Sequence, residues 1–260
     1  MRDERFGKMR KTGDYYGKIF LSNECGYYQI TLANHIDRMK AIFLITNTEV
    51  WVTVDQVDSG CVLDRKYPTV FGVGYLGDYP TTNEDGVKSK EYNTWKGMLD
   101  RCYGKRKLDA YKYCIVSEEF HDASYFKDWY NKQRGCHRDD FHLDKDILSD
   151  GCKIYAEDIC VLVPREVNNF FVDHRDKRGV GGYPVGVSYD SKCADNPFTV
   201  KYGGHGGEPH VSYHNNEWSA LLAYKRAKES RARELAEKWR GHIDDRVYDK
   251  LITYKVLLTD

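Results

Sequence analysis

The feature that most constrains the fold is the run of residues 141–171. The run Phe-His-Leu-Asp-Lys-Asp-Ile at 141–147 precedes a Ser-Asp-Gly turn at 149–151. A mostly apolar stretch, 154–163, leads into the run 164–171. Alternating and apolar runs bounded by turn residues are typical of short strands. The pattern therefore predicts a strand, a turn, a second strand and a helix, in that order.

This order of elements resembles the core of HNH endonucleases. In that family a strand ends in an Asp-His pair, a loop Asn pins the turn, and a helix after the second strand presents a final Asn or His to a divalent metal. The resemblance implies that Asp144 is a ligand for Mg²⁺ and that Lys145 stands where the family has its general-base His. It also places Asp158 at the turn-pinning Asn, and Asn168 or Asn169 at the last metal ligand. Mg²⁺ prefers such oxygen ligands and would bind the scissile phosphate while a base deprotonates water.

The lysine at position 145 is the main departure from the family pattern. A lysine has a reference pKa of about 10.4, and the flanking Asp144 and Asp146 favour its protonated form. His142, two residues upstream of Asp144 and therefore on the same strand face, could serve as the base instead. Alternatively, Lys145 acts as a cation at the phosphate. The substitution favours a third interpretation, an HNH scaffold kept to bind DNA or a partner.

The C-terminal part of the chain is the second informative region. Three β-forming runs at 181–189, 196–202 and 210–213 predict three strands, and the residues 215–217 cap a helix that runs to about Trp239. The Tyr-Pro-x-Gly-Val opening and the Glu-Trp-x-Ala-x-x-Ala-Tyr helix start resemble the ethylene-response-factor (APETALA-like) DNA-binding domain found beside HNH cores in phage and homing proteins. The resemblance implies that the sheet enters the major groove of DNA.

One face of this predicted sheet supplies candidate DNA contacts. Phe198, Val200 and Tyr202 alternate toward the helix, so the opposite face can reach bases and phosphates. The candidates in this region are Arg178, Lys192, Thr199, Lys201 and His210.

A basic stretch precedes the HNH-like run. Residues 87–112 include eight Lys and Arg against three Asp and Glu, a local excess of five positive charges. Apolar residues from Trp95 to Cys102 have the spacing of one helical face, so the predicted helix 91–101 carries its basic residues on the other side. A second short helix with aromatic core residues is predicted at 120–130. Phosphate affinity comes from cationic surface. The candidate DNA contacts in this stretch are Lys96, Arg101, Lys105 and Arg106.

Residues 15–70 show short alternating apolar runs with Asn, Gly and Asp breaks, and predict a small curled sheet or barrel. The Gly-rich segment 72–77 lacks a long helix directly after it, so we interpret it as a linker and not as a phosphate loop. The expected fold class is α+β, with a small N-terminal β-barrel-like domain, an HNH-like ββα domain and a C-terminal three-stranded sheet plus helix. The expected boundaries are 12–72, 73–176 and 177–240, followed by a tail at 241–260.

The overall composition restricts the function only weakly. Forty Lys and Arg balance forty Asp and Glu, and this zero net charge gives no global support for nucleic-acid binding. No apolar run approaches the roughly 20 residues that cross a bilayer, and the polar start lacks the core of a secretory signal. We therefore expect no membrane partner and a cytoplasmic location in an infected host cell, where the eight cysteines stay thiols. Because no cysteine pair in the HNH-like region has Cys-x-x-Cys spacing, no zinc is expected.

The whole order of regions resembles phage proteins usually described as HNH or homing endonucleases, most strongly from Tyr92 to Asn169. We expect a phage DNA-binding protein on a degenerate HNH scaffold, non-catalytic or weakly catalytic. Its expected partner is double-stranded DNA, with a host protein as a further candidate. The alternative is a Mg²⁺-dependent homing or nicking DNA endonuclease with His142 and Lys145 as catalytic residues.

Overall fold

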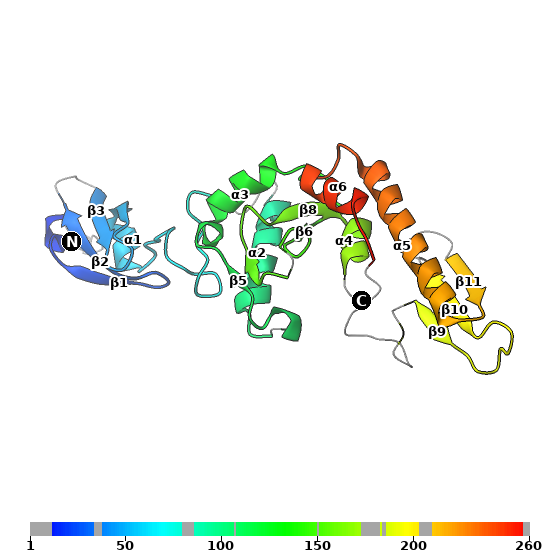
Figure 1. Cartoon of the computed structure of the whole chain (residues 1–260). Coiled ribbons are helices and arrows are strands. Elements are labelled where there is room, and N and C mark those ends of the chain that lie inside the picture. Colours follow the sequence, from blue (N-terminus) through cyan, green and yellow to red (C-terminus); the bar gives the residue numbers. More distant parts are fainter. Residues whose placement is uncertain are drawn as a thin grey trace, which may run out of the picture. The chain divides into compact units, whose positions relative to one another are not determined.

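The computed structural model describes residues 12–33, 38–79, 86–106, 108–149, 151–172, 183, 186–202 and 210–256. The described residues form a mixed α+β structure with six α-helices and several small sheets (Figure 1). Contacts divide the chain into two compact units, Met1–Trp129 with Lys153–Tyr155, and Tyr130–Cys152 with Ala156–Asp260. The α+β class is confirmed, while the expected domain boundaries stay predictions.

The first unit begins with a four-stranded antiparallel sheet whose neighbours follow sequence order. Alternate residues such as Tyr28, Ile30 and Phe43 are fully buried and form its core. The expected barrel-like closure is wrong. Within the described residues the two edge strands do not pair, and four short strands are too few to close around side chains. The strands are β1 (Ile19–Ser22), β2 (Gly26–Leu32), β3 (Arg38–Phe43) and β4 (Glu49–Thr53), with the 3₁₀ turn η1 (Thr12–Tyr15) before them and α1 (Val54–Asp58) after them.

Two longer helices complete the first unit and match the helices predicted from apolar spacing. The first is capped by Ser89, whose side chain accepts the N–H of Tyr92, and it buries Trp95 and Leu99. Around it lie two short parallel strands and two 3₁₀ turns. In chain order these elements are α2 (Lys90–Tyr103), η2 (Asp109–Tyr111), β5 (Ile115–Val116), η3 (Glu119–His121), α3 (Ala123–Lys132), which ends in the second unit, and β7 (Ile154–Tyr155).

The second unit contains a ββα core, which consists of β6 (Phe141–Asp144), β8 (Val161–Pro164) and α4 (Arg165–Phe171). The two strands pair antiparallel, and α4 packs against both. The apolar run 154–163 is divided between β7 and β8 by a turn at Ala156–Cys160, and only β8 belongs to the ββα core. Cys160 N–H donates to Ala156 O in this turn, and the polar residues Glu157 and Asp158 end the apolar run.

A three-stranded antiparallel sheet and a long helix follow in the same unit. The strands β9 (Val187–Tyr189), β10 (Phe198–Tyr202) and β11 (His210–His214) are ordered β11-β10-β9. Helix α5 (Glu217–Trp239) lies along one face of this sheet, where its N-terminal half buries Ala220 and Tyr224 (Figure 1). A strand lies in each of the three predicted runs, although β9 covers only Val187–Tyr189 of the run 181–189, part of which lies outside the described residues. The predicted end of the helix at Trp239 is confirmed.

Helix α6 (Asp245–Ile252) packs against α5, and the residues after it return along α5. Glu229 accepts the N–H of Val256 at 3.1 Å and the Lys225 ammonium at 2.6 Å, and Lys225 also donates to the Val256 carbonyl. Two side chains of one helix therefore satisfy the backbone of Val256 as a neighbouring strand would. None of the helices in the described parts of the chain is both long and apolar enough to span a membrane.

Candidate functional site

Strand β6 carries the first candidate residues. His142 pairs with Val163 and Asp144 with Val161, so both side chains lie on the same face of the two-stranded sheet. The other face carries Phe141, which packs against Trp239 of α5 with ring centroids 5.6 Å apart. His142 is exposed and Asp144 is half-buried. The structure thus brings the candidate base and the candidate metal ligand to one face.

The Asp144 carboxylate caps the turn that follows β6. Its Oδ1 accepts the backbone N–H groups of Asp146 and Ile147, both at 2.8 Å. Burial raises the pKa of Asp144, and the two backbone hydrogen bonds oppose that rise. Both bonds use Oδ1, which leaves Oδ2 without a hydrogen bond among the described residues. Asp144 therefore has a structural role in the turn and one carboxylate oxygen that a cation could use.

Lys145 points inward. It is only 2% exposed, its ammonium forms an ion pair with Asp146, and it lies 3.4 Å from the carbonyl of Cys152. Cys160 is fully buried nearby, and burial raises the pKa of its thiol to about 12. An ion pair with a carboxylate requires the protonated ammonium, which cannot accept a proton. The geometry of Lys145 is therefore that of a buried structural cation.

Helix α4 presents the remaining metal candidates. Asn168 is half-buried and Asn169 is exposed, and their helix packs on β6 and β8 as the HNH resemblance implies. Among the described residues, no three His, Cys, Asp or Glu side chains are grouped to hold a metal. A magnesium ion can be held by a single carboxylate together with substrate phosphate oxygens. The residues present fit Mg²⁺ only in that form, with Asp144 as the carboxylate.

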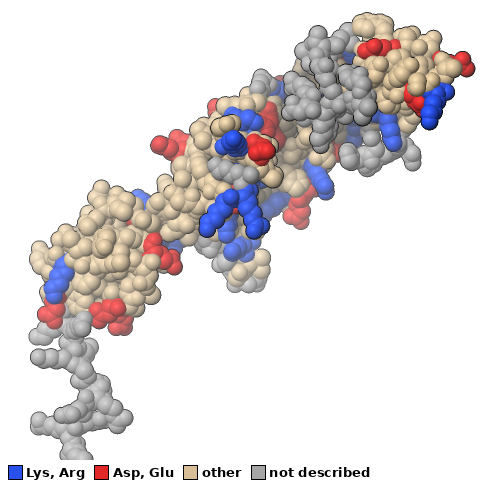
Figure 2. All heavy atoms as spheres, turned by 90° about the horizontal axis from the view of Figure 1, so that it is seen from below, with Lys and Arg blue, Asp and Glu red and all other residues tan. Residues whose placement is uncertain are grey.

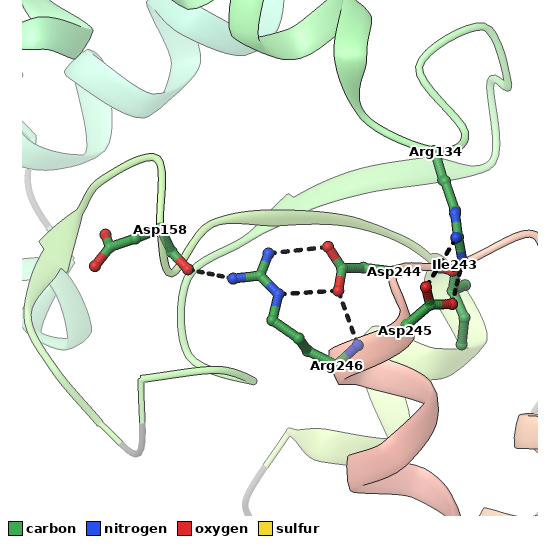
Figure 3. Close-up of polar contacts among 6 residues, drawn as sticks. All are labelled: Arg134, Asp158, Ile243, Asp244, Asp245 and Arg246. Carbon is green, nitrogen blue, oxygen red and sulfur yellow. Dashed lines mark hydrogen bonds and ion pairs between the residues drawn. The ribbon is translucent and has the colours of Figure 1, made fainter.

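The loop that contains Asp158 is held by a residue that the sequence reasoning missed. Figure 3 shows that Arg246 of α6 donates to the backbone carbonyl of Asp158, while the Asp158 carboxylate points away from it. Arg246 is itself oriented by Asp244, and this hydrogen bond and charge lower the pKa of Asp244 despite its burial. Arg246 thus holds the backbone of this loop, and the turn-pinning role of the Asp158 side chain stays a prediction. The signal in the sequence was the acidic pair directly before Arg246 at the start of α6.

Glu166 of α4 is a second residue that was missed. It accepts hydrogen bonds from Arg231 at 3.1 Å, from the Trp239 indole at 2.7 Å and from Lys238, all on α5. Burial alone would raise its pKa, but these hydrogen bonds and charges together hold the pKa below its usual value. Glu166 therefore fixes the helix that carries Asn168 to the C-terminal half of α5.

The outer face of the three-stranded sheet collects part of the predicted DNA contacts. Ser188, Thr199 and Tyr213 lie side by side across the three strands, and Lys201 is opposite Val211 in a neighbouring row. Phe198 and Val200 are buried on the other face against α5, as predicted. These outer side chains are half-buried or exposed, and Tyr213 is 66% exposed. The face therefore presents hydroxyl groups, one ammonium and an aromatic ring.

The other candidates in this region are placed differently. His210 is exposed but pairs with Tyr202, so the register puts it on the helix side of the sheet and not with Thr199 and Lys201. Lys192 is exposed in the turn between β9 and β10. Arg178 lies outside the described residues.

The basic candidates of the first unit also divide into two groups. Arg101 donates to the Tyr155 hydroxyl at 3.1 Å and lies over the rings of Tyr155 and Tyr111, so it is used in packing. Lys105 and Arg106 are exposed just after α2, and Lys96 is half-buried on the helix. On the face shown in Figure 2, several Lys and Arg side chains lie close together on the middle part of the chain.

Comparisons with known proteins add no family to these observations. No protein-family model matches the chain, and neither the curated proteins nor the solved structures give a match. All eight cysteines lie in described residues and are free thiols. The functional argument therefore rests on the residues themselves.

Proposed function

We propose that this protein binds double-stranded DNA on a degenerate HNH-type scaffold of phage type and does not depend on cleavage for its function. The observation that carries the proposal is the state of Lys145, which is buried and ion-paired at the position where the resemblance implies a general base. A residue in that state stabilises the turn and cannot take a proton from water. The ββα core is then a scaffold, and DNA contact falls to other surfaces.

The outer face of the sheet is the first of these surfaces. Thr199, Lys201 and Tyr213 share this face with their side chains directed away from the α5 core. A lysine contacts phosphate, and a threonine hydroxyl can contact a phosphate or a base edge. The exposed Lys105 and Arg106 of the first unit would add phosphate contacts that carry no sequence information.

Duplex binding tests the proposal. Fluorescence anisotropy with a labelled 20-base-pair duplex, measured across a range of salt concentrations, should give an affinity that falls as salt rises. The double charge reversal Lys192→Glu and Lys201→Glu should weaken binding by roughly 10- to 100-fold at low salt and reduce the salt slope by about one for each lost phosphate contact. Lys132→Glu, an exposed lysine at the end of α3, is the matched control. Equal affinities for all three proteins would exclude the sheet as the DNA-binding surface.

A Mg²⁺-dependent endonuclease is the second candidate function. It is favoured by the shared face of His142 and Asp144 and by the packing of α4 on β6. In that case Asp144 and an amide oxygen of Asn168 or Asn169 would hold Mg²⁺, which would polarise the scissile phosphate. The exposed imidazole of His142 would accept a proton from the attacking water.

Plasmid nicking with Mg²⁺ or Mn²⁺ distinguishes the two candidates. Absence of nicking by the native protein, together with weak nicking by Lys145→His, supports a degenerate nuclease, since His has a reference pKa of about 6.5 and can accept a proton at neutral pH. Nicking by the native protein that is lost in His142→Ala supports the enzyme. Nicking that survives His142→Ala and is lost in Lys145→Ala would make lysine itself essential and refute both assignments.

A further inference from the structure

A strained turn lies beside the basic helix of the first unit. Val70 and Gly74 are hydrogen-bonded to each other in both directions, at 2.9 Å each, and close a tight hairpin turn. Phe71 and Gly72 in this turn have φ angles of +53° and +77°. The left-handed region suits glycine or asparagine in such turns, and a phenylalanine there is strained. The turn is held on α2 because Gly74 packs so closely that an added Cβ would lie 2.4 Å from Leu99.

The facing side of α2 carries a second residue that local packing does not explain. Gly97 lies in the middle of this helix, where glycine is one of the least favourable residues. An added Cβ at Gly97 would meet nothing within 4 Å, so no neighbour requires the small residue. Space at this position is therefore kept open at the expense of helix stability.

Phe71 and Gly97 border the same depression. It has a volume of about 250 Å³, and its other lining residues are Asn93, Lys96 and Asp100. Pockets for drug-sized ligands have volumes of roughly 300–1,000 Å³, so the depression suits a smaller group. An aromatic ring, a glycine, an amide, an ammonium and a carboxylate thus line a shallow depression that is open to solvent. Two locally unfavourable residues that meet at one concave site are typical of a binding function.

The surroundings favour a nucleotide over a neutral aromatic group. The stretch 87–112, which contains most of the lining, has an excess of five positive charges and attracts phosphate. A base can stack on a phenylalanine ring. Asparagine and aspartate can read its edge, because an amide pairs with donors and acceptors and a carboxylate accepts from an exocyclic amine. The Asn93 side chain is exposed, and among the described residues it makes only a long hydrogen bond of 3.4 Å to the Lys88 carbonyl, so its amide can turn toward a ligand.

We propose that the depression between Phe71 and Gly97 receives one unstacked nucleobase of a DNA strand, with the ring on Phe71 and the adjoining phosphate near Lys96. This inference rests on the proposed function, because it assumes that DNA is the partner. It adds a site that recognises a single base outside the duplex, separate from the outer face of the three-stranded sheet.

The test uses the full chain and two fluorescein-labelled 12-residue DNA strands, one with natural bases and one with abasic sugars throughout. The native protein should bind the base-bearing strand roughly 10-fold tighter, which corresponds to one base stacked on an aromatic side chain. Gly97→Leu fills the depression and should reduce the preference to within about twofold, while its affinity for the abasic strand stays unchanged. Asn131→Leu, which adds the same side chain at an exposed position of α3, should keep the preference.

Two further measurements show whether a lost base preference comes from the filled site or from misfolding. Gly97→Leu replaces a poor helix former and should raise the midpoint of thermal unfolding by about 2 °C. Phe71→Asn gives the turn an Asn-Gly pair, which suits left-handed conformations, so it should fold and yet lose the base preference. A preference that survives both substitutions overturns the proposal. If the native protein binds duplex DNA tightly but does not prefer the base-bearing strand, only the nucleobase site is excluded. If it binds no DNA at all, the proposed function is excluded as well.

Discussion

In the ββα core charged side chains are turned toward one another, whereas on the outer face of the three-stranded sheet polar side chains are turned to solvent. Lys145 is buried and forms an ion pair with the exposed Asp146, Asp144 caps a turn, and Glu166 accepts three hydrogen bonds from α5. On the sheet, Lys201 and Tyr213 are exposed. The difference teaches that charged side chains in the ββα core are used in contacts within the fold, while the polar side chains of the sheet face stay available for a partner. Substitutions should therefore change stability in the core and binding on the sheet.

The largest expected effect on stability is at Glu166. Glu166→Ala removes the acceptor of three hydrogen bonds and leaves Arg231, Lys238 and the Trp239 indole without it, so we expect a loss of about 3 kcal/mol in the free energy of unfolding. Urea denaturation followed by circular dichroism measures it. Glu234→Ala, an exposed carboxylate paired with the same Arg231, should cost less than about 0.5 kcal/mol. Equal losses of unfolding free energy at the two positions would contradict the prediction that the hydrogen bonds between Glu166 and α5 stabilise the fold.

The next effect concerns the ion pair between the buried Lys145 and the exposed Asp146. Asp146→Asn removes the carboxylate partner of Lys145 and should cost about 2 kcal/mol, less than the roughly 3–5 kcal/mol of a fully buried pair because Asp146 is more than half exposed. Lys145→Met replaces the buried charge by an apolar chain of similar length and should change stability by less than about 1 kcal/mol. The reverse order of the two losses, measured by the same denaturation, would show that the pair is a net source of stability.

A smaller effect distinguishes Asp144 from Glu166 by pH. The pKa of Glu166 is lowered in the folded protein, so its contribution is present above the unfolded value of 4.5 and is lost as pH falls through the folded pKa. The pKa of Asp144 is raised, so the folded form takes up a proton first and gains stability as pH falls toward 3.8. Asp144→Asn should keep the turn cap through its amide oxygen, leave stability at pH 7 within about 1 kcal/mol, and remove this gain. The free energy of unfolding of the variant and of the native protein, measured between pH 3 and 7, checks the direction of this change. A difference between the two proteins that stays constant over that range would contradict it.

The smallest effect on stability is expected on the sheet. Thr199→Ala and Tyr213→Ala truncate side chains of the outer face, and each should change the free energy of unfolding by less than about 0.5 kcal/mol. Their effect should appear in duplex affinity instead, as a several-fold loss measured by anisotropy. A loss of more than about 1 kcal/mol in stability with unchanged DNA affinity would show that these side chains stabilise the fold, like those of the core, and do not bind DNA.

Much of the fold could be predicted because it follows from apolar spacing. The strands β9 to β11, the end of α5 at Trp239 and the buried face of α2 were all anticipated. The shared face of His142 and Asp144 followed from the two-residue period of a strand. These features depend on neighbours close in sequence, which is why the sequence reveals them.

The features that could not be predicted depend on residues distant in sequence or on register. Lys145 between two aspartates resembles a solvated turn, and its burial depends on packing around Cys152 and Cys160. The contact of Arg246 with Asp158 spans 88 positions. The place of His210 depends on the pairing register of β10 and β11, since a shift of one residue exchanges the faces of a strand.

The continuity of α5 has a mechanical consequence. Its N-terminal half is packed on the sheet, and its last turns are held to α4 through Glu166 and to Phe141 through Trp239. A helix of 23 residues rises about 1.5 Å per residue and forms a stiff rod about 34 Å long. The sheet and the ββα core are therefore joined by one continuous helix, so a displacement of the sheet is transmitted to the core.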